Sequence, residues 1–181
     1  QGCSDLPELT GRGRVAARLT AQSLAGSGIS LVVSSPLRRA LDTAQEILDE
    51  FRREGLPVPE LKTDDRLKEI DLPEWQGLPF AEVKNRFPEQ HQVWMSEPHR
   101  LRMRPEFGGT AFPVLDLFEQ ARLFWKDLLS NHNVNQVLLV AHGGSGRALI
   151  STAVAVGPAR FHSLQLSHGG ITAIEFFRSA A

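Results

Sequence analysis

Cysteine is almost missing from this chain of 181 residues, in which only Cys3 occurs. A single cysteine excludes an internal disulfide framework and is typical of a reducing compartment. Cys3 is also not the nucleophile of a cysteine-dependent phosphatase loop, because Leu9 stands where such a loop needs an arginine. Disulfide scaffolds and cysteine-based phosphoryl chemistry are therefore excluded.

An excess of either charge and a long apolar run are missing as well. Lysine and arginine number 20 against 21 aspartates and glutamates, which gives a formal net charge of -1. Nucleic-acid-binding domains carry a basic excess, and a membrane-spanning helix needs roughly 20 apolar residues in a row. The first residues show no secretory signal pattern. We therefore expect no nucleic-acid or membrane partner and a cytoplasmic location.

Motifs for metal and nucleotide cofactors are not found either. The histidines show no ligand spacing, and nothing resembles His-Glu-x-x-His. No glycine-lysine phosphate loop occurs, and the stretch GRGRVA at 11–16 follows PELT rather than a strand, as a dinucleotide site would require. We therefore expect neither a metal ion nor another cofactor.

The apolar residues that are present follow helix and strand patterns. They recur at helical spacing in four segments, at about 10–25, 36–51, 113–129 and 145–156. Short apolar runs predict three strands, at 29–35, near Leu61 and at 136–141. Thr10 can cap the first helix, and Ser35 with Pro36 signals the start of the second.

Strands that alternate with long helices predict an α/β fold with a mainly parallel sheet flanked by helices on both faces. HSLQLS (162–167) and ITAIEFF (171–177) lie on either side of a glycine turn and predict a closing hairpin, which adds an antiparallel edge strand. The segment 64–109 is expected to be irregular because prolines interrupt it. The length favours one domain over 1–181.

Two predicted strands lead directly into helices through polar segments, SSPLRRALDTA (34–44) and AHGGSGRAL (141–149). In open parallel sheets, ligands bind beyond the carboxyl ends of the strands. A helix N-terminus at that edge favours an anion, because its backbone N–H groups are free and the helix dipole is positive there. Arg39 and His142 are therefore expected at the same edge of the sheet, with Gly143 at the second helix start.

The two arginines of the first segment are expected to differ. Arg38 shares a helix face with Asp42, so a solvated ion pair between them is the simplest interpretation. Arg39 lies off that face, one turn from the N-terminus, where a guanidinium can bind two phosphate oxygens. A structural role for Arg39 is equally compatible with its position.

Other candidate groups also have two interpretations. His142 is either catalytic or merely structural, whereas His168 repeats the His-Gly-Gly letters in a turn and is expected at the surface. Glu69 stands in a loop with apolar neighbours that could keep it protonated as a general acid. Asp71 and Glu74 compete for that role, and a plain exposed loop carboxylate is the alternative.

Together these segments resemble the histidine phosphatase superfamily, also called phosphoglycerate-mutase-like. QGCSDLPELTGRG (1–13) is similar to the family's QGxxDxPLTxxG stretch, and residues 34–47 to its SPLxRAxxTAxxI helix. LKEIDLPEWQGL (67–78) resembles the acid loop and VLLVAHGGSGRAL (137–149) the turn that carries a second histidine. The acid loop, WMSEP and the C-terminal part look most like the plant 2-carboxyarabinitol-1-phosphate phosphatases and their cyanobacterial relatives.

The resemblance implies a phosphohistidine mechanism without a metal. In the family, an Arg-His-Gly motif on the first strand supplies the nucleophilic histidine, and we expect this motif shortly before Gln1. Arg39 and His142 would neutralise the transferring phosphoryl group, and Gly143 would belong to the phosphate site. Glu69 would protonate the leaving alcohol and then take a proton from the attacking water.

The family also implies an insertion over the pocket, here 82–109. Its basic cluster of Arg100, Arg102 and Arg104 would hold a second anionic group of the substrate, or is simply a solvated basic loop. Many members have Gly-Glu-Ser where this chain has Thr110 and Ala111, so the role of that glutamate is open.

The implied function is hydrolysis of a small phosphorylated metabolite. One alternative is a phosphoglycerate mutase, which returns the phosphoryl group to a bound product instead of water. The other is an inactive phosphate-binding or interaction domain, which is what residues 1–181 describe if no nucleophile precedes them. A homodimer is compatible with the resemblance, and the plant likeness adds the plastid stroma as a location.

Overall fold

The computed structural model describes residues 2–5, 7–130 and 135–177. Within them, three strands form one parallel sheet in the order β2-β1-β3: β1 Leu31–Ser34, β2 Glu60–Thr63 and β3 Val137–Val140. In the central strand, Val32 is paired with Leu61 on one side and with Leu138 on the other. The predicted parallel sheet is confirmed.

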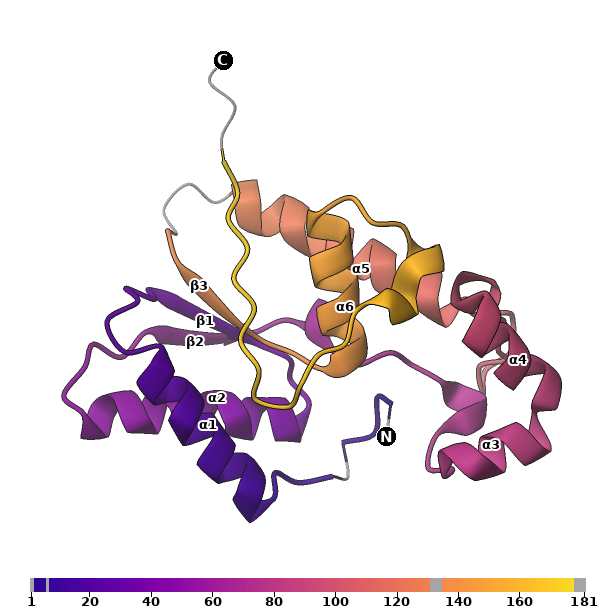
Figure 1. Cartoon of the computed structure of the whole chain (residues 1–181), viewed down its shortest axis with the longest axis horizontal. Coiled ribbons are helices and arrows are strands. Elements are labelled where there is room, and N and C mark those ends of the chain that lie inside the picture. Colours follow the sequence, from indigo (N-terminus) through magenta and orange to yellow (C-terminus); the bar gives the residue numbers. More distant parts are fainter. Residues whose placement is uncertain (1, 6, 131–134, 178–181) are drawn as a thin grey trace.

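Helices cover both faces of this sheet (Figure 1). Two pack on one face, α1 Gly11–Ser23 and α2 Arg38–Arg53, and two on the other, α5 Pro113–Ser130 and α6 Gly143–Ala153. Successive side chains of a strand point to opposite faces. Val32 therefore packs with α1 and α2, while Val33 packs with α5 and α6. None of the described helices is long and apolar enough to cross a membrane.

The helix starts agree with the sequence patterns only in part. Thr10 caps α1 by accepting a hydrogen bond from the Gly13 N–H at 3.1 Å, as predicted. The second helix begins at Arg38 instead of Pro36, and its Arg38 N–H donates to the Asp5 carboxylate. The helix α6 begins two residues earlier than expected, because His142 is the N-cap.

The segment 64–109 contains more helix than we expected. It holds α3 Phe80–Arg86 and α4 Pro88–Ser96, together with short 3-10 turns at Asp65–Leu67, Pro73–Trp75 and Pro98–Arg100. These α-helices have only 7 and 9 residues, so their apolar residues do not repeat often enough to show a helical period. Trp75 and Trp94 meet edge to face, with ring centroids 5.9 Å apart, and so fix this insertion to the loop after β2.

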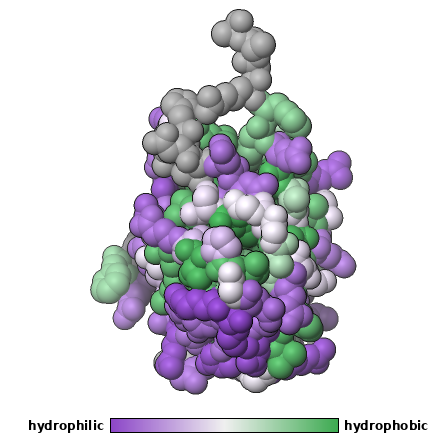
Figure 2. All heavy atoms as spheres, turned by 90° about the vertical axis from the view of Figure 1, so that its left-hand side faces the viewer, coloured by the Kyte–Doolittle hydropathy of each residue, from purple (hydrophilic) through white to green (hydrophobic). Residues whose placement is uncertain are grey.

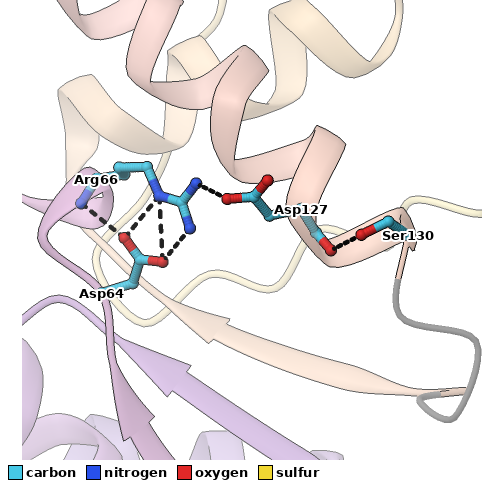
Figure 3. A network of polar contacts seen from close by, with 4 residues as sticks. All are labelled: Asp64, Arg66, Asp127 and Ser130. Atoms are coloured by element: carbon cyan, nitrogen blue, oxygen red, sulfur yellow. Dashed lines mark hydrogen bonds and ion pairs between the residues drawn. The ribbon is translucent and has the colours of Figure 1, made fainter.

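An ion-pair network fixes the start of that loop (Figure 3). The Arg66 guanidinium contacts the Asp64 carboxylate at 2.6 Å and the Asp127 carboxylate of α5 at 2.5 Å. Arg66 also lies over the Phe124 ring, 5.5 Å from its centroid. Because Asp64 donates its backbone N–H to the Ser34 carbonyl, the network connects the sheet, the loop and α5.

The predicted C-terminal hairpin is wrong. After a last 3-10 segment, Pro158–Ser163, the residues 164–177 form no strand, although a turn is present at 168–169. The turn rests on α1, where the Thr20 hydroxyl donates to the Gly169 carbonyl at 3.1 Å. The extended chain beyond it runs past β3 (Figure 1) and lines one groove together with β3.

This groove has a volume of about 2690 Å³. Its lining residues come from β3, from the segment 165–177, and from α1 and α6. Three of the four β3 residues are only partly buried, whereas all four of β1 are buried. Figure 2, seen from the side where the strands begin, shows apolar residues reaching the surface above a band of polar ones.

Candidate active site

The structure brings Arg39, Glu69, His142 and Gly143 together along one end of the groove. Arg39 lies in the first turn of α2, after β1, and His142 caps α6, after β3. Since β1 and β3 are neighbouring parallel strands, their carboxyl ends meet at the same edge. The loop after β2 adds Glu69 to this edge.

His142 is held at its ring and at its backbone. Its Nε2 lies 2.8 Å from the hydroxyl of Ser35, and its backbone N–H donates to the Ser145 hydroxyl at 3.0 Å. Burial, and then the nearby positive charge of Arg39, lower the pKa of His142 to about 4. The imidazole is therefore neutral near pH 7 and acts on a ligand as a hydrogen-bonding group.

Arg39 is oriented by the N-terminal segment. Its two terminal nitrogens donate to the backbone carbonyls of Ser4 at 2.7 Å and Gly2 at 2.9 Å. Among the described residues, no carboxylate forms an ion pair with this guanidinium. Carbonyl oxygens orient the group without neutralising it, so its charge remains available to an anion in the groove.

Glu69 lies in a different environment from the apolar loop that the sequence indicated. Its Oε1 accepts hydrogen bonds from three backbone N–H groups: Gly144 at 2.8 Å, Ser145 at 3.2 Å and Ile70 at 2.8 Å. The first two belong to the N-terminus of α6. The carboxylate of Glu69 thus takes the place at this helix start where we expected a bound anion, just as Asp5 does at α2.

The second glycine of the His-Gly-Gly stretch is explained by this contact. A Cβ on Gly144 would lie 2.3 Å from Glu69 Oε1, far inside contact distance, whereas one on Gly143 would meet Oε2 at an ordinary 3.8 Å. With Oε1 occupied by three N–H donors, Oε2 is the oxygen that can exchange a proton with a ligand.

The thiol of Cys3 is hydrogen-bonded to the loop that carries Glu69. It donates to the Glu69 backbone carbonyl at 2.7 Å. Burial, followed by the charges of Asp71 and Glu69, raises the pKa of this thiol to about 11, so it stays protonated and keeps its donor. The N-terminal segment therefore contacts Arg39 and Glu69 together.

Asp71 and Glu74, the two alternative candidates for the general acid, do not line the groove. Asp71 is exposed. Glu74 accepts from the Gln90 side chain at 3.0 Å and from the Arg104 backbone N–H at 2.9 Å, which ties the acid loop to the insertion. Of these three carboxylates, Glu69 is the one that lines the groove.

The basic cluster of the insertion does not join the site in this structure. Arg100 pairs with Glu97 at 3.0 Å, and Arg102 stacks over Phe112, 5.4 Å from the ring centroid. The residues that line the groove do not include Arg100, Arg102 or Arg104. A contact of these arginines with a second anionic group stays a prediction.

Two further expectations are modified by the structure. Arg38 forms its ion pair with Glu8 at 2.8 Å, not with Asp42, which lies 3.7 Å from Arg14 instead. His168 is exposed in a turn, as expected, but this turn also borders the long groove where it passes α1. Only His142 of the two has Arg39 as a charged neighbour.

The sequence analysis missed two contributors, Ser35 and the backbone of residues 2–4. The pattern predicts a helix start at Ser35, whereas its fully buried hydroxyl faces His142. The carbonyls of the N-terminal segment carry no side-chain signal at all. Gln1, which opens the quoted N-terminal stretch, lies outside the described residues.

No metal centre accompanies this arrangement in the part of the chain that the structure describes, where no three His, Cys, Asp or Glu side chains gather as ligands. The model of one protein family, the histidine phosphatase superfamily (branch 1), matches residues 1–181. The chain belongs to this superfamily.

Relatives within the histidine phosphatase superfamily have named activities. The chain is 33% identical over 180 residues to a probable 2-carboxy-D-arabinitol-1-phosphatase of Arabidopsis thaliana, covering 99% of this chain and 35% of that protein. It is 29% identical over 174 residues to phosphoserine phosphatase 1 of Hydrogenobacter thermophilus, covering 96% and 77%. It thus spans about a third of the plant relative's length and most of the bacterial one's.

Solved structures of this superfamily have the same architecture. The mycobacterial glucosyl-3-phosphoglycerate phosphatase in complex with inorganic phosphate superimposes with a TM-score of 0.73 at 30% identity, covering 91% of this chain and 77% of that one. The expected superfamily and α/β fold are therefore confirmed.

Proposed function

We propose that the protein hydrolyses the phosphate monoester of a small metabolite through a phosphohistidine, without a metal. The observation that carries this proposal is the convergence of Arg39, Glu69 and His142 at one end of a single groove. The names of its relatives, which are phosphatases, favour transfer of the phosphoryl group to water over transfer to a bound product.

The nucleophile of this proposal is the histidine of an Arg-His-Gly strand that lies in the groove beside β3. Within the described residues, β3 has β1 as its only strand neighbour, and its partly buried residues line the groove. A strand added there in parallel would end at the same edge as β1 and β3, because parallel strands share their direction. Its terminal histidine would thus reach the edge that holds His142.

The residues of the site divide the chemistry between them. The nucleophilic nitrogen forms a bond to phosphorus while the bond to the alcohol oxygen breaks, and that oxygen takes its proton from Glu69 Oε2. Water then attacks phosphorus, gives its proton to Glu69 and releases phosphate from the histidine. Arg39 and the neutral ring of His142 bind the equatorial oxygens, whose charge must be balanced throughout.

A fusion protein tests this function. A strand of apolar residues ending in Arg-His-Gly is placed before Gln1, and the control fusion carries Arg-Asn-Gly. We expect the first fusion to hydrolyse alkyl phosphates and to trap an acid-labile phosphoryl group on its added histidine, and the control to do neither. An equal activity of both fusions, or of neither, would contradict the proposal and favour a phosphate-binding domain.

The role of Glu69 is tested in the active fusion. Glu69→Gln should slow the hydrolysis of alkyl phosphates by roughly two to four powers of ten, the range for losing a general acid–base group. The loss should be smaller for p-nitrophenyl phosphate, whose leaving group needs no proton, and a burst of phenolate should precede slow turnover. A normal rate for Glu69→Gln together with an inactive Asp71→Asn or Glu74→Gln would assign the acid elsewhere.

A further inference from the structure

The helix α2 begins without an anionic group of its own. Its N-cap residue, Leu37, makes no side-chain hydrogen bond to the helix, and no acidic residue stands in the first turn. That turn instead carries Arg38 and Arg39, two cations at the positive end of the helix dipole. Because like charges meet at this helix start, an anionic acceptor from elsewhere in the chain stabilises it.

Asp5 supplies this acceptor. Its carboxylate accepts the backbone N–H of Arg38. The carbonyls just before it accept from the two terminal nitrogens of Arg39, Ser4 at 2.7 Å and Gly2 at 2.9 Å. This stretch of chain forms no helix or strand, so contacts with other elements hold it in place. Three such contacts therefore converge on one turn of α2, and two of them orient the guanidinium.

We propose that Asp5 is a positioning residue for Arg39. By accepting the Arg38 N–H, its carboxylate fixes the preceding carbonyls relative to α2, and these carbonyls fix the guanidinium. A group that is already oriented loses less freedom when it binds an anion, so its orientation strengthens binding. This role rests on the proposed function, in which Arg39 binds the equatorial oxygens of the phosphoryl group.

The charge of Asp5 and its positioning role have opposite effects on phosphate binding. A nearby carboxylate repels an anion, so removing its charge alone should strengthen binding, whereas releasing Arg39 should weaken it. Glu8 is the matched control, because its carboxylate pairs with the exposed guanidinium of Arg38 at 2.8 Å and not with the helix N–H. Glu8→Ala removes the same charge beside the same residue and leaves the contact of Asp5 with the helix unchanged.

The first measurement needs no turnover. The guanidinium of Arg39 is observed by ¹H–¹⁵N NMR in the 181-residue chain, where two hydrogen bonds should slow its rotation and separate the signals of its terminal N–H groups. We expect separate signals in the parent chain, in Glu8→Ala and in Asp5→Asn, which keeps an acceptor oxygen. In Asp5→Ala the signals should merge. Asp5 is exposed, so its removal leaves the apolar core as it is.

Separate signals in Asp5→Ala would overturn the proposal, as would merged signals in Glu8→Ala. Merged signals in the parent chain would overturn it too, because Arg39 would then not be held by the carbonyls at all.

In the active fusion, inorganic phosphate is the probe. Asp5→Ala should raise the inhibition constant of phosphate about tenfold, the scale of one hydrogen bond to a charged group. Glu8→Ala and Asp5→Asn should leave this constant unchanged or lower it. In Asp5→Ala, kcat/KM should fall by the same factor for alkyl phosphates and for p-nitrophenyl phosphate, because Glu69 still supplies its proton.

A lower inhibition constant in Asp5→Ala would show that only the charge of Asp5 matters, and would overturn the proposal. The expected NMR signals together with an inactive fusion would separate the two proposals: Asp5 would position Arg39, and the site would not be a phosphatase.

Discussion

At the scale of single residues, backbone groups do most of the work of holding the site. Glu69 rests on three N–H groups, and Arg39 on two carbonyls. Backbone dipoles orient a charged group without neutralising it, whereas an opposite side-chain charge would orient the group and also neutralise it. Both side chains therefore have fixed positions at the groove, while burial keeps the neighbouring ring of His142 neutral.

A first prediction compares the two adjacent glycines. Gly143→Ala meets only an ordinary contact and should raise the free energy of unfolding by up to about 1 kcal/mol, because alanine favours a helix over glycine. Gly144→Ala pushes Glu69 off the helix N-terminus. This change should lower the free energy of unfolding by about 2 kcal/mol, the scale of hydrogen bonds to a charged group. Urea denaturation measures both values.

A double-mutant cycle is the control for this comparison. In a Glu69→Ala background, the cost of Gly144→Ala should largely disappear. A cost that stays the same would show that the methyl group collides with Ile70, 3.2 Å away, and not with the carboxylate.

A second prediction concerns the pH dependence of stability. The pKa of His142 is lowered from its ordinary 6.5 to about 4 in the folded chain. Between these values the unfolded chain binds a proton that the folded chain does not, so stability is fully present above pH 6.5 and falls as the pH drops towards 4. At about 1.4 kcal/mol per pKa unit, this contribution amounts to about 3 kcal/mol.

Replacing His142 by Asn isolates this contribution, since Asn also caps helices well. The stability of His142→Asn should decline less steeply between pH 6.5 and 4 than that of the parent chain, as measured by urea denaturation at several pH values. Parallel declines would mean that His142 titrates normally.

At the scale of elements, the long segments followed the sequence patterns and the short ones did not. The stripe of α2 and the apolar face of α5 repeat over many turns, so their periodicity is unmistakable. The helices α3 and α4 have 7 and 9 residues, and their stability comes from tertiary packing, such as the contact of Trp94 with Trp75.

A third prediction tests the network that fixes the loop of Glu69. The Asp64 side chain is only 20% exposed and contacts Arg66 through both oxygens, so Asp64→Asn should cost about 1.5–3 kcal/mol of the free energy of unfolding. Asp127 binds the same guanidinium but is 64% exposed, so Asp127→Asn should cost less than about 1 kcal/mol. Equal costs in urea denaturation would contradict this difference.

The same network predicts an acid-labile contribution. Hydrogen bonds from Arg66 hold the pKa of Asp64 below its usual value. The stabilisation is therefore present above the unfolded aspartate pKa and is lost as the pH falls through the lower folded value. Asp64→Asn should remove this part of the acid response.

At the scale of the whole molecule, the groove beside β3 is the dominant feature. Among the described strands, β3 has β1 as its only neighbour, so it forms one edge of the sheet and lines the groove. The residues 165–177 also line this groove and form no strand.

A fourth prediction follows for hydrogen exchange. In a parallel strand, alternate residues turn their N–H groups to opposite neighbours. A fused strand that enters the groove should therefore protect every second amide of Val137–Val140, those that do not bond to β1, and leave the others as they are. A control strand with a central proline lacks a ladder donor and should protect less. Uniform protection, or none, would place the added strand elsewhere.

The likeness of several motifs indicated the superfamily and the acid loop of Glu69. The sequence by itself also determined the parallel sheet, the long helices and the edge at which Arg39 and His142 stand. These follow from periodicity and from strand-to-helix turns, which are local signals. Only the tertiary structure decided which groups hold them: Asp5 and Glu69 at the helix starts, the carbonyls of Gly2 and Ser4, and the hydroxyl of Ser35. These contacts join residues far apart in the chain, and backbone groups are the same at every position, so no local pattern announces them.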